Sequence, residues 1–340
     1  MMRTIPIARR GGKLENPWRV GCVILKRMNW KLTRIRNGGQ SNPRSAAACG
    51  VLAVMLVGFA GLLAAPGQAT SGQATSTEGS PLGVAPKEWA RDAAMNELKV
   101  LNYGRSYLRY REHTNDEKGN HLREVIESKD GPVARLLMKE GRPLTPQEDK
   151  WEHDRLQAML DSPAAYAKHV KGDVSGKKMG SDLIKLTPDA MLYSYTPGQP
   201  QRLDRVLQAD DLPEIVIDYK PNPKWTAPTI SSDALTGVEG RVWIDPKTHY
   251  LTRMEADIFR PVNFGLFLAR IYPGGKLTFE QTRMGERRWI FSKFTEKITL
   301  RVLIKTIKED TDIEAWGFSV VPEMSYQDAI KMLWAMPLPK

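Results

Sequence analysis

The stretch that most constrains the fold is Gly237–Pro261, GVEGRVWIDPKTHYLTRMEADIFRP, which alternates apolar and polar residues on both sides of a short turn. Arg241–Asp245 and Leu251–Phe259 are rich in the β-branched, aromatic and other apolar residues that are typical of strands. Asp-Pro opens the turn between them, because proline presets φ and aspartate bonds nearby backbone N–H groups. The stretch therefore predicts an antiparallel hairpin.

This hairpin has one apolar and one charged face, because successive residues of a strand point to opposite sides. Val242 and Ile244 fall on one face of the first strand, and Met254 and Ile258 fall on one face of the second. Arg253, Glu255 and Asp257 fall on the other face of the second strand. Something must cover the apolar face of such a sheet, and the function of the protein depends on what covers it.

The rest of the chain reads mainly as further strands of an antiparallel meander, nine to eleven in all, with little βαβ alternation. The sequence therefore predicts an α+β fold whose sheet curls. The expected strands are Tyr107–His113, His121–Ser128, Val133–Lys139, Met191–Tyr195, Glu214–Tyr219, Val262–Tyr272, Lys276–Arg283, Arg287–Lys297 and Ile298–Ile307, and Asp116–Asn120 is the expected turn of the first hairpin.

Four helical segments are expected among these strands, and one of them is a helical piece within Ala164–Leu186. Pro86–Leu101 has apolar residues at helical spacing, and a last helix starts at the Ser325 cap. The clearest start is Thr145-Pro146-Gln147-Glu148, a capping box with proline at N1, which predicts a helix to about Leu160. This inserted helix either packs on the sheet or forms a movable lid over an apolar cavity. Lys171–Gly180 is expected to be a surface loop, because it is rich in glycine and lysine.

The N-terminal region has the pattern of an export leader. Ala46–Ala65 is twenty residues without a charge, preceded by basic residues and followed by Gly67 and Ala69 at the −3 and −1 places of a cleavage site. Translation that starts at Met28 would leave a leader of more usual length. Because twenty apolar residues also span a bilayer, an uncleaved anchor is the alternative. We expect a leader over 1–69, a Ser/Thr/Gly/Pro-rich linker over 70–86 and a single half-barrel domain over 87–340.

The basic charge of the whole chain belongs to this leader. Eleven of the 50 Lys/Arg and one of the 39 Asp/Glu precede Thr70, so 39 basic and 38 acidic residues remain. A chain near +1 gives no reason to expect nucleic acid as a partner. Both cysteines, Cys22 and Cys49, also lie in the leader, so the exported part would have no disulfide or cysteine nucleophile.

No motif predicts catalysis, a metal or a cofactor. Gly172 and Gly176 are four apart and Lys177 is followed by another lysine, so the phosphate-loop spacing fails. The five histidines have no helical i, i+4 pair, and the pair His113 and His121 of the first hairpin is expected to be solvated. There is no G-x-S-x-G. We therefore expect no enzyme activity, no cofactor and no metal site.

At its central hairpin the chain resembles the periplasmic lipoprotein-carrier family, the outer-membrane lipoprotein-sorting proteins. The similar residues are W-I-D-P at Trp243–Pro246 and L-T-R-M-E at Leu251–Glu255. The resemblance extends in layout over Trp89–Ile307, and it implies an unclosed β-barrel with a helical lid that encloses an apolar cavity for acyl chains. The chain departs from the family in its charged insertion Glu140–Asp161, and the carrier's lid arginine has no identified counterpart, which leaves the cargo open.

Two functions follow as hypotheses. The first is a periplasmic or otherwise exported carrier that binds a lipid or other apolar ligand, with membrane contact that is transient or made through an uncleaved leader. The second is a non-catalytic envelope module with a fully packed sheet, which binds envelope proteins through its loops. The residues expected to line the ligand cavity are Val242, Ile244, Met254, Ile258, Phe264, Leu266 and Leu268.

Overall fold

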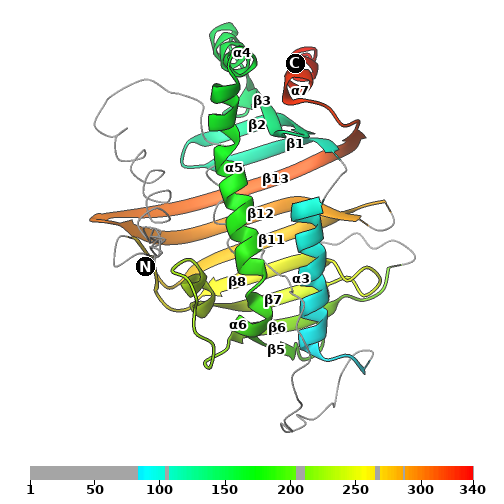
Figure 1. Cartoon of the computed structure of the whole chain (residues 1–340), viewed down its shortest axis with the longest axis vertical. Coiled ribbons are helices and arrows are strands. Elements are labelled where there is room, and N and C mark those ends of the chain that lie inside the picture. The colour runs from blue at the N-terminus through cyan, green and yellow to red at the C-terminus, as the bar shows by residue number, and fades with distance from the viewer. Residues whose placement is uncertain (1–82, 104–106, 204–210, 265–268, 286–287, 340) are drawn as a thin grey trace, which may run out of the picture. The chain divides into compact units, whose positions relative to one another are not determined.

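The computed structural model describes residues 83–103, 107–203, 211–264, 269–285 and 288–339 (Figure 1). The expected leader and nearly all of the expected linker lie outside these residues. The described part is one large antiparallel sheet with helices packed on it, so the α+β prediction is confirmed.

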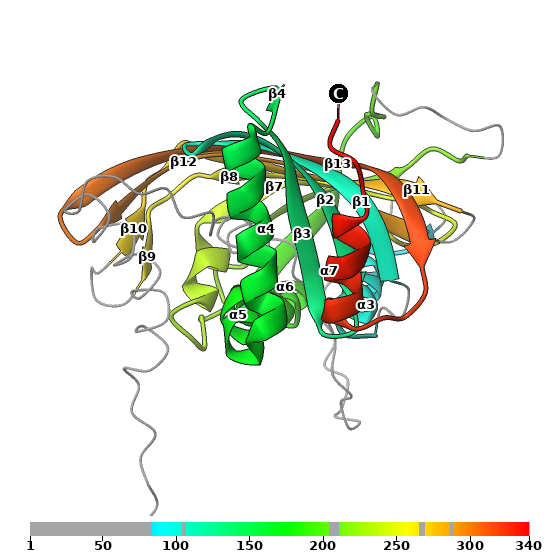
Figure 2. The same cartoon turned by 90° about the horizontal axis from the view of Figure 1, so that it is seen from above.

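The sheet has the order β4-β3-β2-β1-β13-β12-β11-β8-β7-β6-β5, with the short β10 beside β12 and β9 beside β10. Its two end strands do not pair with each other, so the sheet is curved but open (Figure 2). The strands are β1 (Tyr107–Asp116), β2 (Gly119–Ser128), β3 (Gly131–Lys139), β4 (Arg142–Pro143), β5 (Met191–Tyr195), β6 (Ile215–Pro221), β7 (Val238–Ile244), β8 (Leu251–Ile258), β9 (Val262–Phe264), β10 (Ala269–Ile271), β11 (Gly275–Met284), β12 (Arg288–Val302) and β13 (Lys305–Val321).

The central hairpin forms as the sequence predicts. β7 and β8 pair antiparallel, with Val242 opposite Met254 and Val238 opposite Ile258. The side of these strands that carries Val242, Ile244, Met254 and Ile258 is called the inner face below. The side that carries Trp243 and its partner Arg253 is called the outer face.

The helices are α3 (Pro86–Tyr103), α4 (Pro146–Asp161), α5 (Pro163–Ile184), α6 (Thr187–Ala190) and α7 (Tyr326–Trp334), with a 3₁₀ turn η2 (Ser232–Thr236). The capping box at the start of α4 is present, because the Thr145 side chain accepts from the Glu148 backbone and Glu148 reaches back to Thr145. Ser325 caps α7 as expected. Figures 1 and 2 show α3 and α5 crossing the concave side of the sheet.

The expected loop at Lys171–Gly180 is wrong, because this stretch lies inside the continuous helix α5. Gly172, Gly176 and Gly180 are four residues apart, so they share one side of the helix, and all three are buried. Glycine costs a helix about 0.5–1 kcal/mol relative to alanine. Burial of the three glycines indicates that close packing of α5 offsets this cost.

The expected strand Ile298–Ile307 is also wrong, because the chain reverses in its middle. β12 continues from Arg288 to Val302, a two-residue turn follows at Leu303 and Ile304, and β13 returns from Lys305. Leucine and isoleucine are not turn residues, so the alternation runs through the turn without a break in the sequence pattern.

Two further expectations are corrected in detail. The first hairpin is tighter than the expected Asp116–Asn120 turn, because Asp116 already pairs with Gly119. His113 lies opposite Leu122 and His121 opposite Thr114, so the two histidines are not cross-strand partners.

The expected strand Val262–Tyr272 is instead the antiparallel pair β9 and β10, and residues 265–268 between them lie outside the described part.

Candidate functional site

The inner face is the site that the sequence predicts for an apolar ligand. In the structure Val242, Ile244, Met254 and Ile258 are 0–4% exposed. Protein atoms therefore cover these four side chains. Of the other predicted cavity residues, Phe264 lies in β9 with its side chain outside the described part, and Leu266 and Leu268 lie wholly outside it.

Helix α3 covers part of this inner face. Phe279 of β11 pairs with Met254, which places both on the inner face, and Gln281 lies two residues further along the same strand. The Gln281 side chain donates to Glu97 of α3 over 2.7 Å, so α3 lies against this face. Its buried apolar residues are Trp89, Ala90, Ala93, Ala94 and Leu98, and Leu98 packs with Ile184 of α5.

The turn between β7 and β8 is the anchor for α3. Asp245 is 4% exposed, and its carboxylate accepts from the backbone N–H of Thr248 at 2.9 Å and from the Thr248 hydroxyl. This Asx-type turn orders the Thr248 and His249 carbonyls, which both accept hydrogen bonds from Asn96 of α3. The aspartate of the W-I-D-P segment therefore shapes the surface on which α3 docks.

His249 adds two contacts between the same turn and α3. Its Nδ1 lies 2.7 Å from a carboxylate oxygen of Asp92, and its ring lies 4.5 Å from the Trp89 ring. Asp92, Asn96 and Glu97 with their partners on the sheet are called the α3 latch below. The latch is polar, and it joins α3 to residues that lie 152 to 184 positions further along the chain.

Glu97 is the buried titratable group of the latch, and only 5% of it is exposed. Burial raises the pKa of Glu97 to about 7, and the hydrogen bond from Gln281 opposes this rise. The buried Gln281 Oε1 accepts no hydrogen bond from the described residues. A protonated Glu97 fits beside it, because a carboxylic acid can donate to an amide oxygen while it accepts from the amide nitrogen. The latch therefore favours neutral Glu97.

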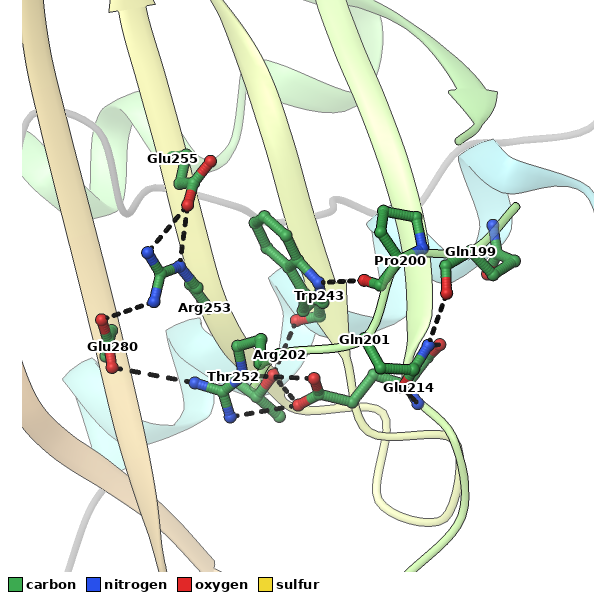
Figure 3. Close-up of polar contacts among 10 residues, drawn as sticks. All are labelled: Gln199, Pro200, Gln201, Arg202, Glu214, Trp243, Thr252, Arg253, Glu255 and Glu280. Atoms are coloured by element: carbon green, nitrogen blue, oxygen red, sulfur yellow. Dashed lines mark hydrogen bonds and ion pairs between the residues drawn. The ribbon is translucent and has the colours of Figure 1, made fainter. Parts of the chain in front are cut away.

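The outer face carries a polar network beneath the segment that follows β5 (Figure 3). Arg202 pairs with the Glu214 carboxylate at 3.1 and 3.2 Å, and both side chains are almost completely buried. Thr252 also donates to Glu214. The Gln199 side-chain amide pairs with the backbone N–H and C=O of Val216 in β6. The Gln201 amide pairs in the same way with Glu214, the residue before β6. This network fixes the segment to the sheet.

Trp243 is held in the same network. Its indole N–H donates to the Pro200 carbonyl at 2.9 Å, and Arg253 stacks 5.6 Å from its ring centroid. Arg253 also pairs with Glu255 and Glu280, at 2.8 Å each. Arginine on an aromatic face is favourable, and Arg202, Glu214, Trp243 and Arg253 have no buried side-chain nitrogen or oxygen without a hydrogen-bond partner. The outer face at β6–β8 is therefore a closed structural cluster.

A separate pocket of about 290 Å³ lies on β1, β2 and β13. Arg109 and Arg111 both donate through Nε to Glu124, which is nearly buried, at 2.6 and 3.3 Å. Trp316, at 42% exposure, forms another wall. Two guanidinium groups beside one carboxylate leave the pocket cationic, so it suits an anionic group.

Two further observations concern other kinds of site. Among the described residues, no group of three or more His, Cys, Asp or Glu side chains is arranged to hold a metal ion. No helix in the described ranges is long and apolar enough to cross a membrane.

Sequence reasoning missed the α3 latch, although one signal was present. Glu97 follows Ala90, Ala93 and Ala94 at seven-, four- and three-residue spacing, so it lies on the apolar side of the helix. A carboxylate in that stripe needs a buried partner. The partner, Gln281, is 184 residues away, and nothing local predicts it.

Comparison with known proteins adds little. No protein-family model and no curated protein matches the chain. Among solved structures, the crystal structure of MucB in complex with MucA(peri) is similar at 10% identity, over 71% of this chain and 100% of that chain, with a TM-score of 0.19. A TM-score this low supports no inference about the present chain.

Proposed function

We propose that this chain is an exported carrier-like protein that binds a lipid or another apolar ligand against the inner face of its sheet. The observation that carries the proposal is an open, curved antiparallel sheet whose apolar face is covered by a helix held in place through polar contacts. When an acyl chain covers apolar surface on such a face, the binding free energy becomes more favourable by about 25 cal/mol per Å² of surface removed from water.

Ligand entry requires a covering helix to move, because Val242 and Met254 are only 2% and 4% exposed. We assign this movement to α3. Its latch consists of hydrogen bonds that water can replace on opening, and the helix lies next to the N-terminal end of the described chain. In this mechanism α3 is a lid, and Val242, Ile244, Met254 and Ile258 become ligand contacts when it opens.

Native mass spectrometry of protein purified from the envelope fraction tests the proposal. We expect a co-purified species of lipid mass that is released by organic solvent. Protein that is free of ligand, and that also fails to take up added fatty acid or lysophospholipid, would contradict the carrier function.

The export address is tested separately by N-terminal sequencing of the same preparation. We expect the mature N-terminus near Thr70, because the basic, apolar and small-residue segments of a leader end at Ala69. Recovery of chains that still contain Ala46–Ala65 would favour the membrane-anchored alternative.

The second candidate is the envelope interaction module, and the burial of the four inner-face residues favours it. A fully packed inner face leaves partners to other surfaces, such as the pocket where Trp316 is 42% exposed beside Arg109 and Arg111. Exposed aromatic and arginine side chains are typical of protein interfaces. This candidate predicts that no lipid co-purifies and that Trp316→Ala weakens binding to a partner protein.

A further inference from the structure

The tip of the β12–β13 hairpin exposes two large apolar residues. Val302 pairs with Lys305, which leaves Leu303 and Ile304 as the two-residue turn. Leu303 is 46% exposed, and Ile304 is 98% exposed. Single exposed apolar residues are common on protein surfaces, but here two adjacent ones form the end of a projecting hairpin.

The backbone of this turn is a poor place for leucine. Leu303 has a φ of 54°, in the left-handed region that favours glycine. Ile304 is not among the described residues with positive φ. A positive φ at the first central position alone is the pattern of a type II′ turn, which prefers glycine there and a small polar residue next. Stability of the turn therefore favours Gly-Asn or a similar pair, and it does not explain why Leu and Ile occupy these two positions.

The charge around the tip has one sign. Residues 298–308 contain Arg301, Lys305 and Lys308 and no acidic residue. Lys305 and Lys308 are exposed. The nearest acidic residues along the strand, Glu309 and Asp310, lie towards the body of the sheet, where Asp310 pairs with Lys297 at 3.1 Å. The tip is therefore apolar at its end and cationic just behind it.

The tip also projects from the sheet. β11 pairs with β12 only as far as Lys297, and β1 pairs with β13 only as far as Asp312. Beyond these residues the short β10 is the described strand that borders the hairpin. Figures 1 and 2 show the hairpin extending past the ends of its larger neighbours. A flat membrane surface can therefore reach Leu303 and Ile304 without contacting most of the sheet.

We propose that Leu303 and Ile304 insert into the interface of an anionic lipid bilayer, with Lys305, Lys308 and Arg301 at the level of the headgroups. Apolar side chains gain free energy by leaving water, and each nearby cation strengthens binding to anionic lipid about fivefold. The charge pattern selects an anionic bilayer over an apolar protein groove, which would have no need of three flanking cations. The proposal does not depend on cargo in the inner face.

A fluorescent probe at the tip tests insertion directly. Protein purified from the envelope fraction after export, from a chain with Cys22 and Cys49 replaced by serine, carries an environment-sensitive dye on Ile304→Cys. The matched control carries the dye on Ile230→Cys, since Ile230 is 61% exposed and lies on the loop before η2. With vesicles of one part phosphatidylglycerol to three parts phosphatidylcholine, we expect a blue shift at position 304 and none at 230. A probe at 304 that remains in water on vesicle-bound protein would overturn the proposal.

A pair of substitutions separates membrane binding from folding. Leu303→Gly with Ile304→Asn suits the turn, so the urea midpoint should stay equal or rise, while binding to the anionic vesicles should fall at least tenfold. Lys305→Gln with Lys308→Gln should weaken binding roughly 25-fold on anionic vesicles and leave it unchanged on pure phosphatidylcholine. Equal vesicle binding by the Gly-Asn variant and the parent would overturn the proposal. Fatty-acid uptake by both variants is measured separately, because membrane binding through the tip does not depend on whether the protein carries a fatty acid.

Discussion

Glu97 makes the stability of the protein depend on pH, and Glu97→Gln should remove that dependence. The folded state holds the pKa of Glu97 at about 7, above its ordinary value of 4.5, because burial disfavours the carboxylate. A raised pKa means that the folded state keeps a proton that the unfolded state releases. This contribution to stability is complete below pH 4.5 and is lost as the pH rises through 7.

The size of the effect follows from the pKa difference. At about 1.4 kcal/mol per pKa unit, a change from 4.5 to about 7 corresponds to about 3 kcal/mol between pH 4 and pH 8. Glutamine at position 97 cannot ionise, and its amide can donate to the Gln281 Oε1 that now accepts no hydrogen bond from the described residues. Glu97→Gln should therefore be the more stable protein at pH 8.

Urea unfolding followed by tryptophan fluorescence measures this effect at several pH values. The quantity to compare is the difference in unfolding free energy between wild type and Glu97→Gln, because the two proteins have all other side chains in common. Glu88→Gln, on an exposed part of α3, is the matched control and should follow the wild type. A wild-type-to-variant difference that stays constant from pH 4 to pH 8 would refute the burial of Glu97.

Three further substitutions test other parts of the structure. Thr145→Ala removes the capping box of α4 and should lower the unfolding free energy by about 1 kcal/mol in urea titrations, whereas Thr145→Ser should not. Arg202→Ala leaves the buried Glu214 without its cation and should lower the unfolding free energy by about 3–5 kcal/mol. Lys150→Ala, which breaks an exposed ion pair, should lower it by less than about 0.5 kcal/mol. Equal effects of the two substitutions would contradict the network of Figure 3. Met254→Trp overfills the inner face of the closed protein and should cost about 1–3 kcal/mol and reduce fatty-acid uptake, whereas unchanged uptake would exclude Met254 from the ligand site.

The parts of the fold that the sequence predicts are those in which the signal is local. The β7–β8 hairpin follows from alternation around Asp245-Pro246, and the start of α4 follows from Thr145 and Glu148. In both cases the residues that determine the structure are a few positions apart. Their backbone preferences and side-chain hydrogen bonds act within one turn or one hairpin.

The errors arise where tertiary contacts override local preference. Gly172, Gly176 and Gly180 predict a loop by composition, yet all three are buried on one side of α5. The turn at Leu303 and Ile304 has no glycine, proline or asparagine to mark it. The same limit applies to the site, because Glu97 and Gln281 are brought together only by the completed sheet.

The central claim is that an apolar ligand reaches the inner face when α3 opens, and a reversible lock on α3 tests it most directly. Asp92→Cys with His249→Cys places two thiols where the side chains of the latch already meet, in a chain with Cys22 and Cys49 replaced by serine. The carrier account predicts uptake of a fluorescent fatty acid by the reduced protein, loss of uptake on oxidation and recovery with dithiothreitol. Equal uptake by the locked and reduced forms, or no uptake by either, would contradict it.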